Sequence, residues 1–127
     1  MSEKKKILLI VEDEIALLKI LEEEFTKEGF EVLTAIDGVI GLNLALSRHP
    51  DLILLDLILP KMDGLSLLKE LRQDAWGVDA PVIILSNLSD AEKISEASEN
   101  EVFDYLVKAD WKLEDVVKKV KTKLKIA

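Results

Sequence analysis

The feature that most constrains how this chain can fold is a series of short apolar runs that end abruptly at polar residues. Four of these runs are continuously apolar, at Ile7–Val11, Leu52–Leu55, Val82–Leu85 and Tyr105–Val107. A fifth segment, Glu31–Ile36, alternates more. Runs that do not alternate are typical of strands buried on both faces, as in a parallel sheet covered by helices. The sequence therefore predicts five such strands.

The segments between these strands have the spacing of amphipathic helices. Apolar residues recur at Leu18, Leu21 and Phe25 in the first segment, and a similar stripe marks the last. The pair Asp37-Gly38 gives a turn signal before the second helix. Repetition of strand then helix predicts an α/β fold. We expect a flavodoxin-like, doubly wound five-stranded parallel sheet of order 2-1-3-4-5 with five helices, in three α/β/α layers.

Length and charge limit the possible functions. The chain has 127 residues, and we predict a single domain over residues 1–127. Its formal net charge of −8 disfavours direct binding to a nucleic acid or to an anionic membrane surface. No apolar run approaches the roughly 20 residues of a membrane helix, and there is no cysteine for a disulfide or a thiolate metal site. These features fit a cytoplasmic protein.

Polar residues that follow the predicted strands are the candidates for chemistry. Glu12-Asp13 follows the first strand, Asp56 the third, Ser86 the fourth and Lys108 the fifth. In a parallel sheet all of these positions lie at one edge. Open α/β sheets bind ligands at that edge where the strand order reverses, which is here between the first and third strands. We therefore expect Glu12, Asp13 and Asp56 to meet in one crevice.

Three carboxylates in one crevice repel one another unless a proton or a cation offsets their charge. Clustered carboxylate oxygens with access to water suit Mg²⁺, or alternatively Mn²⁺. A cation and Lys108 would neutralise an incoming phosphoryl group, so Asp56 could attack it and form an acyl phosphate, with Ser86 donating to a phosphoryl oxygen. Taken singly, Asp13 fits a helix cap equally well. Taken singly, Asp56 also fits an ordinary loop aspartate, Ser86 a strand-end hydroxyl and Lys108 a solvated charge.

The motifs around these residues resemble one known family. The segment Asp56–Gly64, together with Ile10–Glu14, Ile84–Ser86 and Asp104–Lys108, is similar to the receiver domain of bacterial and archaeal response regulators. The resemblance extends over residues 6–124. It implies a stand-alone, chemotaxis-regulator-like domain of a two-component phosphorelay that is switched by transient phosphorylation. It implies no enzymatic activity beyond the domain's own aspartyl phosphorylation and dephosphorylation.

The resemblance also implies roles for the acidic residues. Asp56 would accept the phosphoryl group from a histidine kinase, a phosphotransfer protein or a small phosphodonor. Asp13, Asp56 and the backbone carbonyl of Ile58 would bind Mg²⁺ directly. Glu12 would act through a bound water molecule.

The remaining implied roles concern the switch. Ser86 would hydrogen-bond the phosphoryl group, Lys108 would pair with it, and Tyr105 matches an aromatic residue that family members swing inward on activation. The output surface would comprise the fourth helix, predicted at residues 91–99, with the fifth strand and fifth helix. It would bind an unidentified output protein, and the domain would be a monomer or a weak phosphorylation-dependent dimer.

Departures from the family pattern leave alternatives open. Asn87 replaces a small residue, Lys108-Ala109 replaces a Lys-Pro pair, and Glu101-Val102 replaces a Gly-Ala pair. These departures keep open a degenerate receiver that binds partners without phosphorylation. An aspartyl-phosphate phosphatase or transferase is disfavoured because nothing supplies a substrate pocket or a cap domain. A flavodoxin-like cofactor binder is disfavoured because Glu12–Glu14 would repel a phosphate.

Two apolar residues bear on the lifetime of an acyl phosphate. Ile58 and Leu88 each lie two residues past a site residue and are expected to shield the phosphoryl group from water. The phosphorylated form should then be comparatively long-lived. Enlarging Leu88 while Ile58 is kept should lengthen that lifetime.

Overall fold

The computed structural model describes residues 4–86, 95, 99, 104–107 and 112–126, and for Ser86 and residues 104–107 it describes the backbone. Ten elements lie in these residues in the order β1 (Ile7–Val11), α1 (Ile15–Lys27), β2 (Glu31–Ala35), α2 (Gly38–Arg48), β3 (Leu52–Leu55), α3 (Gly64–Arg72), the 3₁₀ turn η1 (Gly77–Asp79), β4 (Val82–Ser86), β5 (Asp104–Val107) and α5 (Leu113–Leu124). Most of the helix predicted at residues 91–99 falls outside this range.

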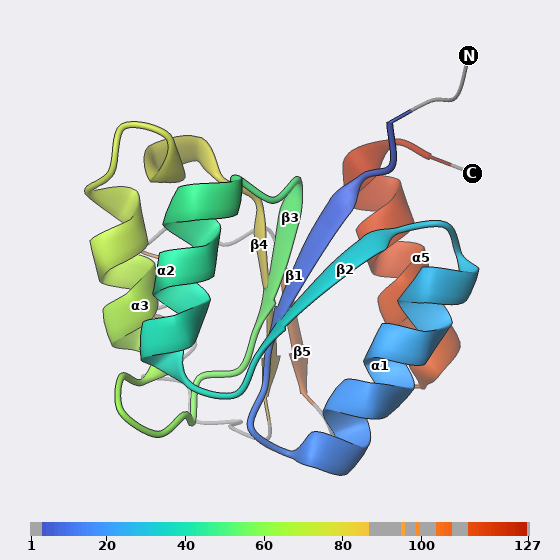
Figure 1. The fold of residues 1–127 in the computed structure, drawn as a ribbon, viewed down its shortest axis with the longest axis horizontal. Helices are drawn as coiled ribbons and strands as arrows, with labels where there is room; N and C mark the ends of the chain where they lie inside the picture. Colours follow the sequence, from blue (N-terminus) through green and yellow to red (C-terminus); the bar gives the residue numbers. More distant parts are fainter. Residues whose placement is uncertain (1–3, 87–94, 96–98, 100–103, 108–111, 127) are drawn as a thin grey trace.

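The strands form one parallel sheet in the order β2-β1-β3-β4-β5 (Figure 1). The parallel α/β architecture is therefore confirmed, and the strand order is the one expected from the sequence. The predicted strand at residues 31–36 ends one residue early, because β2 stops at Ala35 and Ile36 lies 47% exposed in the following turn. In the same sheet, β4 extends one residue past the predicted apolar run, to Ser86.

Alternation along each central strand creates two separate cores. In β1, Leu9 and Val11 belong to the cluster beneath α2 and α3, whereas Leu8 and Ile10 belong to the cluster beneath α1 and α5. Successive strand side chains point to opposite faces, so a strand that is apolar throughout buries both. Figure 1 shows the resulting layers, with α2 and α3 on one side of the sheet and α1 and α5 on the other.

Aspartates begin two of the helices at the carboxyl edge of the sheet. The Asp37 side chain accepts a hydrogen bond from the backbone N–H of Ile40 at 2.8 Å and caps α2. The Asp63 side chain accepts one from the N–H of Ser66 at 2.8 Å and caps α3. Each cap satisfies a backbone donor that the first turn of a helix leaves without an intrahelical partner.

The amino edge of the sheet is closed by packing around η1. The Arg72 guanidinium donates to the carbonyl oxygens of Gly77 and Ala80 at 2.7 and 2.8 Å. The rings of His49 and Trp76 stack with centroids 4.4 Å apart. A Cβ atom at Gly77 would lie 2.2 Å from the Leu71 carbonyl oxygen, so this edge is tightly filled.

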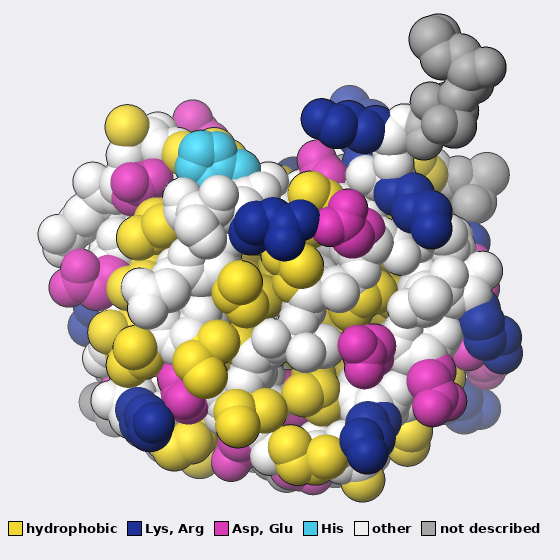
Figure 2. Space-filling view, in the orientation of Figure 1, with side chains coloured by type: hydrophobic (Ala, Val, Ile, Leu, Met, Phe, Trp, Pro, Cys, Tyr) yellow, Lys and Arg dark blue, Asp and Glu magenta, His cyan; other side chains and the backbone are white. Residues whose placement is uncertain are grey.

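The outer face of α2 exposes several large apolar side chains. Val39, Ile40 and Leu46 are 40%, 41% and 37% exposed, and Ile36 precedes them. Figure 2 shows hydrophobic side chains gathered over α2 and the neighbouring part of β2. None of the helices among the described residues has the length and hydropathy of a membrane span.

Candidate functional site

The ends of β1 and β3 bring the candidate acidic residues together. The strand register pairs Val11 with Leu55, and the N–H of Asp56 donates to the carbonyl oxygen of Val11 at 3.0 Å. On the other side of β1, the N–H of Glu12 donates to the Ala35 carbonyl oxygen at 2.9 Å. The hydrogen bonding thus continues one residue past the strands and fixes the backbone of Glu12 beside that of Asp56.

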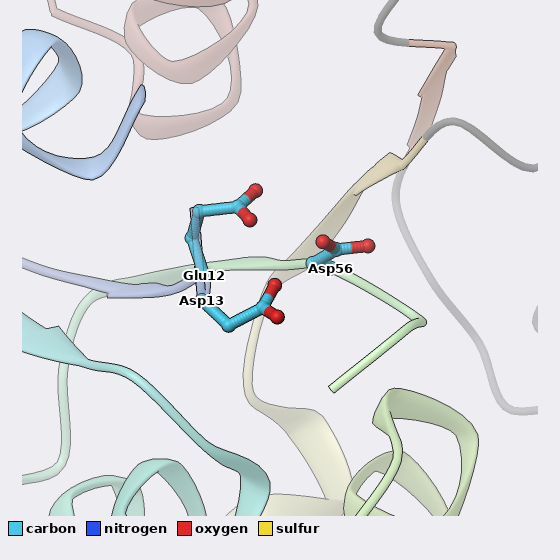
Figure 3. A group of neighbouring side chains, drawn as sticks. All are labelled: Glu12, Asp13 and Asp56. Atoms are coloured by element: carbon cyan, nitrogen blue, oxygen red, sulfur yellow. The ribbon is translucent and has the colours of Figure 1, made fainter. Parts of the chain in front are cut away.

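The three side chains converge as the sequence predicts. Each of Glu12, Asp13 and Asp56 offers one carboxylate oxygen, and these oxygens all lie within 4.8 Å of one another. Figure 3 shows Asp13 and Asp56 reaching from the ends of neighbouring strands toward one space, with Glu12 beside them. Glu12 and Asp56 are buried, at 1% and 4% exposure, whereas Asp13 is exposed. The cluster therefore has a buried floor and an opening to water.

Local hydrogen bonds orient two of the carboxylates. The N–H of Ile58 donates to Oδ1 of Asp56 at 3.1 Å, and the N–H of Glu14 donates to Oε2 of Glu12 at 3.0 Å. The alternative role of Asp13 as a helix cap is not realised, because the N-cap of α1 is Glu14 and no side chain caps it. Asp13 thus contributes its carboxylate to the acidic cluster and does not cap α1.

This donor set fits a small hard cation. Mg²⁺ is held in proteins by one or two carboxylates and keeps several water molecules, for which the exposed side at Asp13 leaves room. The cluster also offers only oxygen ligands, which disfavours softer metals such as zinc or copper. The residues present are consistent with the predicted Mg²⁺ or Mn²⁺ site, to which Glu12, Asp13 and Asp56 would contribute.

A glycine holds the segment after Asp56 close to β3. The N–H of Gly64 donates to the carbonyl oxygen of Leu57 at 2.9 Å. A Cβ atom at Gly64 would lie 2.3 Å from the carbonyl oxygen of Asp56, closer than real contacts allow. The last residue of the Asp56–Gly64 motif is therefore required by close backbone packing directly behind the candidate nucleophile.

Sequence reasoning missed one acidic residue near this loop. Asp37 is 3% exposed, and its Oδ2 lies 3.9 Å from Nζ of Lys61. Lys61 itself adopts a positive φ of 67°. The Asp37-Gly38 pair signalled a turn before a helix, but no pattern in the sequence indicates that this turn faces Lys61.

The other predicted site residues are only partly described. Ile58 lies two residues after Asp56 and is 59% exposed. Ser86 ends β4, where its backbone pairs with Val107, and Tyr105 pairs with Ile84. The side chains of Ser86 and Tyr105 lie outside the described part, and so does Lys108.

The residues in which the family pattern is broken also lie outside the described range. They are Asn87, Glu101, Val102 and Ala109, and the same holds for Leu88. The roles assigned to them and to the Lys108-Ala109 bond stay predictions.

Comparison with known proteins gives a consistent result. The family model for the response regulator receiver domain matches residues 8–121. The chain is 39% identical over 104 residues to the probable transcriptional regulator ycf27 of Cyanophora paradoxa, an alignment that covers 82% of this chain and 42% of that protein. The chain thus spans less than half the length of this relative.

Solved structures share the fold over nearly the whole chain. One is a CheY-like response regulator receiver domain protein from Methanospirillum hungatei, with a TM-score of 0.89, 26% identity and coverage of 96% of this chain and 95% of that chain. Another is the receiver domain of sensor histidine kinase PA1611 from Pseudomonas aeruginosa, with a TM-score of 0.84, 25% identity and coverage of 94% and 97%. That structure has a magnesium ion coordinated in its active site cleft.

Proposed function

The chain belongs to the response regulator receiver domain family, and we propose that it is a phosphorylation-operated switch of a two-component system with Asp56 as the phosphoryl acceptor. The observation that carries this proposal is the convergence of Glu12, Asp13 and Asp56 within 4.8 Å at the ends of two central strands. We propose further that residues 1–127 form a single receiver domain. Its only catalysis would be its own aspartyl phosphorylation and dephosphorylation.

In the proposed reaction, a carboxylate oxygen of Asp56 attacks the phosphorus atom of the donor. An acyl phosphate bond forms, the bond from phosphorus to the donor breaks, and the donor leaves with the bonding electrons. The Ile58 N–H, 3.1 Å from Oδ1, limits rotation of the carboxylate and so presents it in one orientation. Burial of Asp56 at 4% exposure keeps its surroundings low in dielectric, which strengthens nearby charge interactions.

A bound Mg²⁺ would supply positive charge that offsets the phosphoryl oxygens. Asp13, Asp56 and the carbonyl of Ile58 would hold it directly, and Glu12 would hold it through water. Lys108 would pair with the phosphoryl group, and Ser86 would donate a hydrogen bond to it. These assignments rest on the family pattern and on the positions of the strand ends.

The switch would convert this local change into a change of binding surface. Ser86 and Tyr105 would move together, since their backbones lie in the neighbouring strands β4 and β5. The fourth helix, β5 and α5 would then present a different face to an output protein. The phosphoryl group would come from a histidine kinase or a phosphotransfer protein.

The decisive experiment is incubation with a small acyl phosphate and Mg²⁺, followed by intact-mass measurement. The unaltered chain should gain the mass of one phosphoryl group, and a chelator should prevent this. Asp56→Asn should gain none. Asp63→Asn is the matched control, because it removes the same charge from a helix cap seven residues away and asparagine also caps helices.

Labelling of Asp56→Asn, or loss of labelling in Asp63→Asn alone, would contradict the assigned acceptor. No labelling of the unaltered chain, together with normal folding, would instead support the degenerate receiver that acts without phosphorylation.

A further inference from the structure

The β2–α2 turn, Asp37-Gly38, packs against the middle of the loop that carries Ile58. The N–H of Gly38 donates to the carbonyl oxygen of Pro60 at 3.3 Å. A Cβ atom at Gly38 would lie 1.8 Å from the carbonyl oxygen of Met62. With the ion pair between Asp37 and Lys61, this turn touches three consecutive residues of the loop.

The Asp37 carboxylate links the two segments. Its Oδ1 accepts the N–H of Ile40 at 2.8 Å, which fixes the first turn of α2. Its Oδ2 faces Lys61, whose left-handed backbone marks the tip of the loop. Because Asp37 is buried and its side chain caps α2, the turn is tied to the start of that helix and supports the loop from there.

We propose that Asp37 and Gly38 are positioning residues for the metal site. They hold the loop of residues 57–63 in the position relative to the acidic cluster from which the Ile58 carbonyl can bind Mg²⁺. In this way they set the affinity for this ion. The inference rests on the proposed function, since it takes the Ile58 carbonyl as a ligand. Both residues meet the loop at Pro60, Lys61 and Met62, so the effect passes through the loop.

The ion itself gives a test that separates positioning from stability. Mg²⁺ demands near-ideal octahedral geometry at short metal–oxygen distances, whereas Ca²⁺ accepts longer distances and irregular geometry. A loop displaced by a fraction of an ångström should therefore weaken Mg²⁺ binding more than Ca²⁺ binding. A general loss of stability would not change the ratio of the two affinities.

The experiment compares Gly38→Ala with Gly77→Ala by isothermal titration with Mg²⁺ and with Ca²⁺. Both changes force a methyl group against a backbone carbonyl, but Gly77 lies at the amino edge of the sheet. In Gly38→Ala, the Met62 carbonyl and the turn must separate by more than an ångström. We expect the Mg²⁺ affinity to fall by about tenfold, as for other residues that support metal ligands, and the Ca²⁺ affinity to fall less. Gly77→Ala should bind both ions like the unaltered chain.

Mg²⁺ binding by a folded Gly38→Ala within twofold of the unaltered chain would overturn the inference, and so would equal losses for both ions. If the unaltered chain binds no Mg²⁺, both the inference and the proposed function are overturned. Failure of the inference alone is distinguished from this because the unaltered chain then still binds Mg²⁺.

If Gly38→Ala does not fold, Lys61→Met carries the test, because Lys61 is exposed and the change leaves the backbone intact. Charge alone predicts tighter Mg²⁺ binding when a lysine is removed, whereas loss of support predicts weaker binding. Weaker binding agrees with the inference, and unchanged or tighter binding overturns it.

Discussion

Replacing Asp56 with asparagine is expected to stabilise the protein when no divalent cation is present. Two unit charges 4.8 Å apart, the distance within which the converging oxygens lie, repel by about 3.5 kcal/mol at an effective dielectric near 20. Asp56 takes part in two such pairs. Water reduces the repulsion from exposed Asp13, while the asparagine Oδ1 can still accept the Ile58 N–H. We therefore expect a net gain of about 1–3 kcal/mol.

Thermal unfolding followed by circular dichroism measures this gain. For a domain of this size, 1 kcal/mol corresponds to about 4 °C, so Asp56→Asn should melt about 4–12 °C above the unaltered chain in a chelator. Added Mg²⁺ should reverse the order. At about a thousand times its dissociation constant, the ion would stabilise the unaltered chain by about 4.1 kcal/mol, which exceeds the expected gain of Asp56→Asn, whereas Asp56→Asn should respond little.

Asp63→Asn again provides the control. It removes the same charge at an exposed helix cap, and its unfolding free energy should change by no more than about 0.5 kcal/mol in the chelator. The reasoning from repulsion is refuted if Asp56→Asn melts at or below the temperature of the unaltered chain, or if Asp63→Asn gains as much.

Three further predictions follow from other parts of the molecule. Phe25 is fully buried and packs edge-to-face on Phe30, with ring centroids 5.4 Å apart. Phe25→Ala should therefore lower the free energy of unfolding, measured in urea, by about 3–5 kcal/mol. A loss below about 1 kcal/mol would contradict this packing. The hydrogen bond from Lys121 lowers the pKa of Glu28 below 4.5, so its contribution to stability is present above that pH and is lost as the pH falls through the lowered pKa. Lys121→Met should raise this pKa in an NMR titration, and an unchanged value would exclude Lys121 as the cause. Ile58→Ala should shorten the life of the aspartyl phosphate severalfold and Leu88→Phe should lengthen it, as followed by intact mass after donor removal. Equal lifetimes would exclude shielding by these side chains.

Much of the fold and the acidic cluster could be predicted because both depend on burial. The strand Leu52–Leu55 has the same bounds in the structure as in the prediction. A strand that helices cover on both faces is apolar throughout, and the polar residues on either side of it mark where the strand ends. The meeting of Glu12 with Asp56 then follows from parallel pairing and strand order, without any knowledge of side-chain positions.

Other features could not be predicted because they depend on contacts between distant segments. Gly38 lies close to Met62, and Asp37 pairs with Lys61, although more than 20 residues separate the partners in each case. No sequence pattern links these two turns. The Glu31–Ile36 segment was predicted one residue too long because Ile36 is apolar, although it lies exposed. Whether Asp13 caps α1 or joins the cluster likewise depends on where the helix begins, and Glu14 is its N-cap residue.

The central place of β3 has a consequence for the timescale of the proposed switch. All four residues of β3 are buried between β1 and β4, and the amide of Asp56 is itself bonded to Val11. Amide protons of such strands exchange with solvent only through the largest and rarest opening reactions. The amide of Asp56 should therefore be among the slowest to take up deuterium. Its carboxylate would therefore stand on a backbone that opens rarely, so that phosphoryl transfer would take place on the folded strand end and not through local unfolding.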